Sequence, residues 1–224
     1  MAPDPDHRDR FDEAAKWHAV CMLAALTASI ALGRSEPLSV AGVLGLATVG
    51  AILWRADRPK LALPTLVTAF RIAITACLGV LGVTLSGREI VVGVLVVFSL
   101  DGLDGFLARR LGAVSRLGAQ LDNEGDAFLV AVVCVLSWLV VPLGAWILVA
   151  GFLRYLYVLT VMFFPSRGHA PPSRLATRAF GISLVGFLIG LSNLGVVSRV
   201  APLLSTLLLL WSFSRSFYWS LRKA

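Results

Sequence analysis

Charged residues are scarce in this chain of 224 residues. Asp, Glu, Lys and Arg together make up 15% of the sequence, whereas 58% of it is hydrophobic. Because about a quarter of the residues in a soluble domain are charged, this composition excludes an ordinary soluble domain and is typical of a polytopic membrane protein. The net charge of +7 does not indicate a nucleic-acid partner, since excess Lys and Arg in a membrane protein usually mark cytoplasmic loops and lipid-headgroup contacts.

Cysteine and histidine are also rare, with three of each. Cys21, Cys77 and Cys134 lie far apart inside apolar stretches, and an odd number at this spacing gives neither a disulfide framework nor a zinc site. The N-terminal stretch "MAPDPDHRDRFDEAAKW" is too charged and too acidic for a secretory signal peptide. We therefore interpret it as a cytosolic tail.

Long apolar runs are abundant. A membrane-spanning helix needs about 20 mostly apolar residues, and eight stretches qualify, separated by turn and charge signals such as "RADRPK" and "PSRGHAPPSR". They cover roughly residues 17–33, 38–54, 64–85, 89–110, 120–141, 143–164, 176–194 and 199–219. The sequence therefore predicts an all-α, polytopic membrane helix bundle.

The basic residues predict the orientation of this bundle. Eight spans place both termini on the same side of the membrane. Most Lys and Arg residues outside the spans fall in the terminal segments and in the second, fourth and sixth loops, and only Arg34, Arg88 and Arg199 fall on the other side. The positive-inside rule then puts both termini, and the loop between the fourth and fifth spans, in the cytoplasm of a cell-membrane protein.

One acidic segment interrupts the apolar pattern. "DGLDGFLARRLGAVSRLGAQLDNEGD" runs from Asp101 to Asp126 and has aspartates at its start and near its end. At 100° per residue, Asp101 and Asp104 share a helical stripe with Gly105, Ala108 and Gly112, while Asp122 and Asp126 share one with Gly118 and Gly125. Two neighbouring helices thus each offer a carboxylate pair beside small residues, which admit another helix or a ligand close to the backbone.

Four carboxylates this close cannot all stay ionised without a counter-charge. Two divalent ions would supply it, and oxygen ligands suit hard ions such as Mg²⁺, Mn²⁺ or Ca²⁺. Ions of this kind clamp phosphate groups. The aspartates could instead form structural salt bridges to Arg109, Arg110 and Arg116, or line a cation or proton pathway in a transporter.

At this segment the sequence resembles the CDP-alcohol phosphatidyltransferase family (class I). The family's signature is D-x2-D-G-x2-A-R-x8-G-x3-D-x3-D, with a long spacer of eight or nine residues, and every fixed position is matched here. The matching residues are Asp101, Asp104, Gly105, Ala108, Arg109, Gly118, Asp122 and Asp126. The resemblance covers about residues 61–224, the usual six-helix core, and leaves residues 1–60, a tail and two extra transmembrane helices, outside it.

A second stretch supports the resemblance. Family members often begin the core with a "P-N-x-L-T-x-x-R"-like sequence, and "LPTLVTAFR" supplies Pro64, Thr68 and Arg71, although Thr65 stands where Asn is usual. The stretches "LDNEGDAF" and "GFLRYLYV" are similar to a less-characterised bacterial branch of the family.

The resemblance implies a function and a set of roles. It implies metal-dependent transfer of a phosphatidyl group from a CDP-linked lipid, such as CDP-diacylglycerol, to an alcohol, with release of CMP, in phospholipid biosynthesis. Two Mg²⁺ or Mn²⁺ ions would be held by Asp101, Asp104, Asp122 and Asp126, and Asp126 would also be the catalytic base. The residues implied to make room for or bind the cytidine nucleotide are Gly105, Ala108, Arg109, Gly118 and Thr68. A homodimer is also implied.

The acceptor alcohol is not identified by the sequence. Arg154 falls inside a span, where an unpaired guanidinium is costly, and is expected either to contact the acceptor or to pair with a carboxylate or carbonyl. Arg174 and Arg178 are four residues apart and could together bind an anionic acceptor or a lipid headgroup. Arg71 is expected to face inward. The competing functions are a cation transporter that uses the aspartates and a catalytically silent membrane scaffold.

Overall fold

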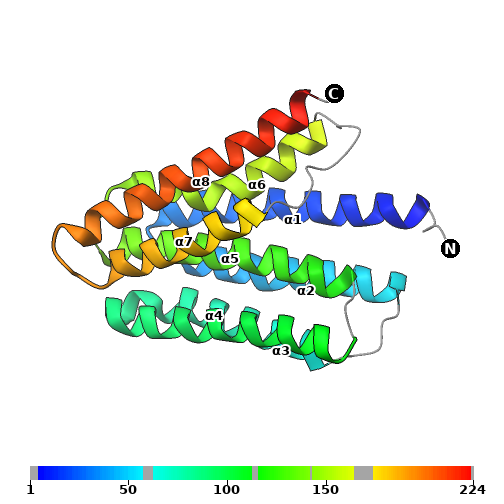
Figure 1. Ribbon diagram of the computed structural model, residues 1–224, viewed down its shortest axis with the longest axis horizontal. Helices are drawn as coiled ribbons and strands as arrows, with labels where there is room; N and C mark the ends of the chain where they lie inside the picture. Colours follow the sequence, from blue (N-terminus) through cyan, green and yellow to red (C-terminus); the bar gives the residue numbers. More distant parts are fainter. Residues whose placement is uncertain (1–4, 58–62, 113–115, 142, 164–173, 223–224) are drawn as a thin grey trace.

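The protein is an all-helical bundle. The computed structural model describes residues 5–57, 63–112, 116–141, 143–163 and 174–222, and within these ranges there is no strand (Figure 1). The α-helices are α1 (Pro5–Leu32), α2 (Glu36–Asp57), α3 (Leu63–Leu81), α4 (Gly87–Arg110), α5 (Arg116–Val140), α6 (Leu148–Phe163), α7 (Arg174–Leu191) and α8 (Val197–Arg222). Two short 3₁₀ turns, η1 (Gly82–Thr84) and η2 (Ala145–Ile147), precede α4 and α6. The predicted fold class is confirmed.

Within the described parts of the chain, five helices are long and apolar enough to cross a membrane. These candidate spans lie in α1, α3, α4, α5 and α8. The apolar stretches of α2, α6 and α7 are shorter and cover 36–52, 145–161 and 175–191. Such lengths lie at the lower end of what can cross the hydrocarbon layer, so the eight apolar stretches seen in the sequence correspond to helices of unequal reach.

The bundle is built around α5. Of the apolar window of α5, 72% is buried inside the protein, against 18–39% for the other four candidate spans. Residues 127–136 are buried without interruption, as expected for a helix that is apolar all round. In Figure 1, α5 lies between the α3–α4 pair and the α6–α8 group. The helix that carries Asp122 and Asp126 is therefore the most buried of the five candidate spans.

The first two helices pack directly onto this core. α1 contacts α6, and α2 contacts both α3 and α5. Gly42 of α2 lies against the Phe128 ring of α5, where an added Cβ would collide with the ring. The glycine thus lets the α2 backbone approach α5 closely.

Both ends of α4, which carries Asp101, are fixed by local signals. At its start, Ser86 and Glu89 form a capping box in which the Ser86 amide and hydroxyl donate to Glu89 Oε2, each at 2.7 Å. Beyond its end, Gly112 has a φ of 59°, a left-handed conformation that favours glycine. In Figure 1, α1 begins and α8 ends at the same end of the bundle as the end of α4 and the start of α5. A chain that crosses the bundle an even number of times in alternating directions must begin and end at the same end of it.

Candidate functional site

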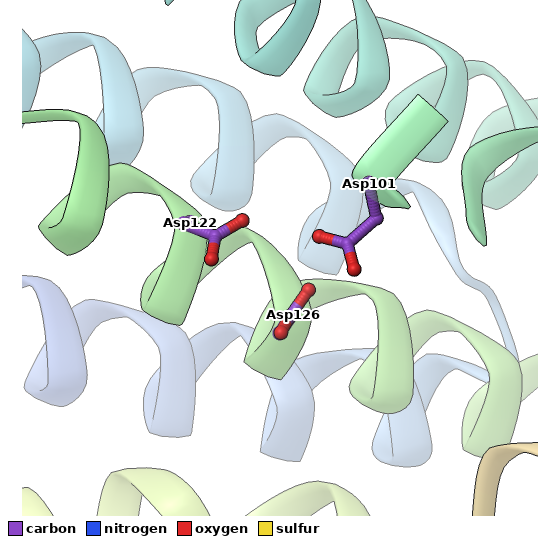
Figure 2. Close-up of side chains that lie close together, drawn as sticks. All are labelled: Asp101, Asp122 and Asp126. Carbon is purple, nitrogen blue, oxygen red and sulfur yellow. The ribbon is translucent and has the colours of Figure 1, made fainter. Parts of the chain in front are cut away.

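Three aspartates from two helices meet at one point. Asp101 of α4 and Asp122 and Asp126 of α5 each present a carboxylate oxygen, and these oxygens all lie within 4.8 Å of one another. Figure 2 shows the carboxylates turned toward one another, with Asp122 and Asp126 one turn apart on α5. Their side chains are 34%, 43% and 28% exposed, respectively, so the cluster is open to a ligand.

The fourth aspartate of the motif is Asp104. Asp104 lies in α4, three residues after Asp101. The side chain of Asp104 is outside the described part of the structure, so its contribution to the acidic cluster stays a prediction.

Arg71 of α3 provides the counter-charge for the three carboxylates. Its side chain is only 3% exposed. Nη1 contacts Asp101 Oδ1 and lies 3.5 Å from Asp126 Oδ1, while Nη2 donates to Asp122 Oδ1 at 2.6 Å. A buried guanidinium is costly unless it is paired. Arg71 and the aspartates therefore stabilise one another, and α3 joins α4 and α5 at the site.

The donor set fits a hard divalent cation. All three groups are carboxylates, which Mg²⁺, Mn²⁺ and Ca²⁺ prefer. Arg71 contacts Asp101 and Asp122 through one oxygen of each, Oδ1, and a carboxylate has a second oxygen that can bind a cation. Among the described residues, this is the cluster of metal-ligand type, and it contains neither His nor Cys. A zinc site would normally include His or Cys, so this donor set does not favour zinc.

Two glycines near the aspartates lie beside guanidinium groups: Gly105 beside Arg109, and the buried Gly125 against Arg71. A Cβ added to Gly105 would lie 3.4 Å from Nη1 of Arg109, and one added to Gly125 would lie 3.4 Å from Nη2 of Arg71. Arg109 is exposed, and Ala108 is half-buried. Arg109 thus offers an exposed positive charge on the helix that carries Asp101, and such a group can bind phosphate.

The remaining residues implied to lie near the nucleotide are Thr68 and Gly118. Thr68 is buried on α3, one turn before Arg71, and its hydroxyl donates to the Pro64 carbonyl at 3.1 Å. Gly118 is half-buried in the first turn of α5. Both lie on helices that carry the Arg71–aspartate contacts.

The residues expected near the acceptor lie in different surroundings. Arg154 of α6 donates from Nη2 to Oε1 of Glu124 at 2.8 Å, and its side chain is 29% exposed. Arg178 is exposed on α7. The side chain of Arg174, where α7 begins, is outside the described residues.

Glu124 and His18 are buried ionisable residues that were not identified as functional candidates from the sequence. Glu124 is 1% exposed and lies between Asp122 and Asp126 in the chain. His18 is 3% exposed in α1. Helical spacing could have revealed Glu124 in the sequence. Glu124 lies 200° around the helix from either aspartate, so it places an acidic side chain on a face of α5 that is otherwise apolar.

Together the fold and the site define a polytopic membrane protein with an acidic centre where α3, α4 and α5 meet. The family model for CDP-alcohol phosphatidyltransferase matches residues 61–213. The chain therefore belongs to the CDP-alcohol phosphatidyltransferase family, and it is a membrane transferase of phospholipid biosynthesis. Comparisons with curated proteins and with solved structures each found no significant match. The match begins after α2, so α1 and α2 lie outside it.

Proposed function

We propose that the protein transfers a phosphatidyl group from a CDP-linked lipid, such as CDP-diacylglycerol, to an alcohol and releases CMP. The observation that carries this proposal is the convergence of Asp101, Asp122 and Asp126 within 4.8 Å, in a chain that belongs to this family. The donor's acyl chains would remain in lipid, and its nucleotide would reach the ends of α4 and α5.

The aspartates hold the cation in this proposal. Asp101, Asp104, Asp122 and Asp126 would hold two Mg²⁺ or Mn²⁺ ions, which would supply positive charge to offset the pyrophosphate and the departing phosphate. The oxygen-only donor set and its partial exposure support this assignment. Arg71 stabilises the same carboxylates from the buried side.

Asp126 acts as the base. The acceptor hydroxyl gives its proton to the Asp126 carboxylate, and its oxygen forms a bond to the lipid-side phosphorus. The bond from that phosphorus to the oxygen of CMP breaks, and CMP leaves with the electron pair. Asp126 Oδ1 lies 3.5 Å from Nη1 of Arg71, and Asp122 Oδ1 lies 2.6 Å from Nη2. A carboxylate is a weak base for an alcohol, so positioning supplies much of the rate.

The nucleotide lies over the small residues of α4 and the start of α5. Gly105, Ala108 and Gly118 leave the space, Arg109 binds the phosphates, and Thr68 lies at the edge of the nucleotide. The guanidinium of Arg109 over Gly105 supports this placement.

Arg154, Arg174 and Arg178 are the proposed acceptor contacts. Arg178 is exposed, and Arg154 is partly exposed while one of its nitrogens binds Glu124. Three cationic side chains suit an anionic acceptor such as a sugar phosphate or glycerol phosphate. We propose that the protein is a homodimer in the cell membrane, and that both termini and the acidic site face the cytoplasm.

A direct assay tests this function. Purified protein in lipid nanodiscs is incubated with radiolabelled CDP-diacylglycerol, Mg²⁺ or Mn²⁺ and a panel of alcohols, and CMP and the lipid product are measured. Product that depends on one alcohol and disappears in Asp122→Asn supports the proposal. No CMP release with any alcohol would favour a silent scaffold, and cation flux into sealed vesicles without CMP release would favour a transporter.

A further inference from the structure

A second charged cluster is buried on the other side of α5. Glu124 Oε1 accepts hydrogen bonds from Nη2 of Arg154 at 2.8 Å and from Nε2 of Gln120 at 3.2 Å. Because Glu124 lies 200° around the helix from Asp122, it faces α6 and α1 and not α3. Two arginines from different helices thus bind α5, Arg71 on one face and Arg154 on the other.

His18 of α1 extends this cluster. Its Nε2 lies 4.0 Å from Oε2 of Glu124, and its ring meets the edge of the Tyr155 ring at a centroid distance of 6.3 Å. On the opposite side, Gly45 of α2 lies against Nδ1, and a Cβ at residue 45 would collide with it. We call His18, Gln120, Glu124, Arg154 and Tyr155 the Glu124 network. It joins α1, α5 and α6, and α2 covers it.

Packing alone does not account for this network. Several of its buried polar atoms have no hydrogen-bond partner among the described residues: both ring nitrogens of His18, Oε2 of Glu124, Nε of Arg154 and the hydroxyl of Tyr155. Apolar side chains of similar volume would often give equal or greater stability, because desolvating two charges can cost more than their attraction returns. In some proteins a buried polar or ionic group instead selects a single geometry between the helices that it joins.

We propose that the Glu124 network sets the rotation of α5 and thereby positions Asp122 and Asp126 for the cation and the donor. This inference rests on the proposed function. The physical reason is that Glu124 lies between Asp122 and Asp126 on one rigid helix. A rotation of α5 that breaks the contacts of Glu124 therefore moves both aspartates. A displacement of about 1 Å at a reacting group can cost about 10²-fold in rate. His18, Glu124 and Arg154 are positioning residues in this view.

α1 lies outside the family match but contributes His18 to the Glu124 network. Because His18 reaches Glu124 from α1, the two N-terminal helices belong to the catalytic unit and are more than an added anchor. Variants of His18 should therefore affect the cation site, although α3, α4 and α5 supply its carboxylates and their counter-charge.

The test compares Glu124→Gln and His18→Leu with the full-length wild type in nanodiscs, using Mn²⁺ binding measured by electron paramagnetic resonance without substrate. A second readout is disulfide formation between Ile72→Cys and Gly125→Cys, after Cys21, Cys77 and Cys134 are replaced by Ala. A Cβ at residue 125 lies 3.6 Å from Cγ1 of Ile72, so this cross-link reports the rotation of α5 against α3. The control is Ser183→Ala, which removes a buried hydroxyl bonded to the Ser205 carbonyl at 3.1 Å, away from α5.

We expect both network variants to bind Mn²⁺ at least about 10-fold more weakly and to cross-link several-fold more slowly. The control should match the wild type. Folded variants with wild-type Mn²⁺ affinity and cross-linking would overturn the proposal. If wild-type protein binds no Mn²⁺, the metal part of the proposed function fails and cross-linking alone decides the positioning role. If Glu124→Gln does not fold, the apolar pair Glu124→Met with Arg154→Met decides, because it should fold and still lose the cross-link.

Discussion

Asp122 and Glu124 are two residues apart on α5, yet they bind arginines from opposite sides of the bundle. Asp122 Oδ1 accepts from Arg71 of α3 at 2.6 Å, and Glu124 Oε1 accepts from Arg154 of α6 at 2.8 Å. The central helix is therefore held on the face that carries the aspartates and on the face behind it. This arrangement ties the acidic site to both halves of the bundle.

Removal of divalent cations should abolish activity. The cluster is made only of carboxylates, so we expect EDTA to stop transfer, Mg²⁺ or Mn²⁺ to restore it, and Zn²⁺ to restore it poorly. CMP release is measured after each addition. Full activity in EDTA would contradict the metal assignment.

Asp126 and Asp101 should fail in different ways. Asp126→Asn keeps most of the polar shape and one oxygen that can still contact a cation, but it cannot accept the proton, so turnover should fall by about 10²-fold or more while donor binding survives. Asp101→Asn removes a charged ligand, so Mn²⁺ and donor binding should weaken together with turnover. Donor binding in Mg²⁺ and the transfer rate are measured for each variant. Near wild-type turnover in Asp126→Asn would exclude it as the base.

Arg71 should matter most when no cation is bound. In Arg71→Met the three carboxylates lose their counter-charge and repel one another at short range. A divalent ion would replace part of that charge. We therefore expect the thermal midpoint of Arg71→Met to fall steeply in EDTA and to recover partly in Mg²⁺.

The matched control for Arg71 is Arg199→Met, which removes an exposed arginine on α8. It should change the midpoint little, and equally in EDTA and in Mg²⁺. Equal loss of stability in both buffers for Arg71→Met would show that the cation does not share its carboxylates.

Gly105 should be needed for the nucleotide and not for folding. An added Cβ meets only the flexible end of Arg109, at 3.4 Å, so the protein itself has room for a side chain. Gly105→Val should raise the donor KM by about 10-fold or more and leave Mn²⁺ binding in place, since a larger side chain fills space that the donor needs. Gly105→Ala, which suits a helix better by about 0.5–1 kcal/mol, should give a smaller rise in KM and no loss of thermal stability. An unchanged KM in Gly105→Val would place the nucleotide elsewhere.

Labelling should reveal the orientation. A single cysteine at Arg110 or Arg174 should react with an impermeant reagent only from the cytoplasmic side, and one at Arg88 only from the outside. Accessibility is measured in intact cells and in inverted vesicles. Reaction of the Arg110 and Arg88 positions from the same side would contradict the eight-span topology.

The sequence by itself determined the helices, because the length and apolarity of a span are local properties. It also indicated that Asp101, Asp122 and Asp126 meet, because the motif spacing puts them on stripes of adjacent helices that can face each other, while the place of Asp104 stays a prediction. It also marked Arg71 as inward-facing, since an arginine inside an apolar helix needs a partner. Only the tertiary structure decided which partner each arginine takes. Arg71 and Asp122 are 51 residues apart, and Arg154 and Glu124 are 30 apart, so their pairing depends on how α3, α5 and α6 rotate and pack. The same reason explains why His18 could not be assigned to Glu124 from the sequence: helical periodicity gives the face of a residue on its own helix, but not the helix that covers that face.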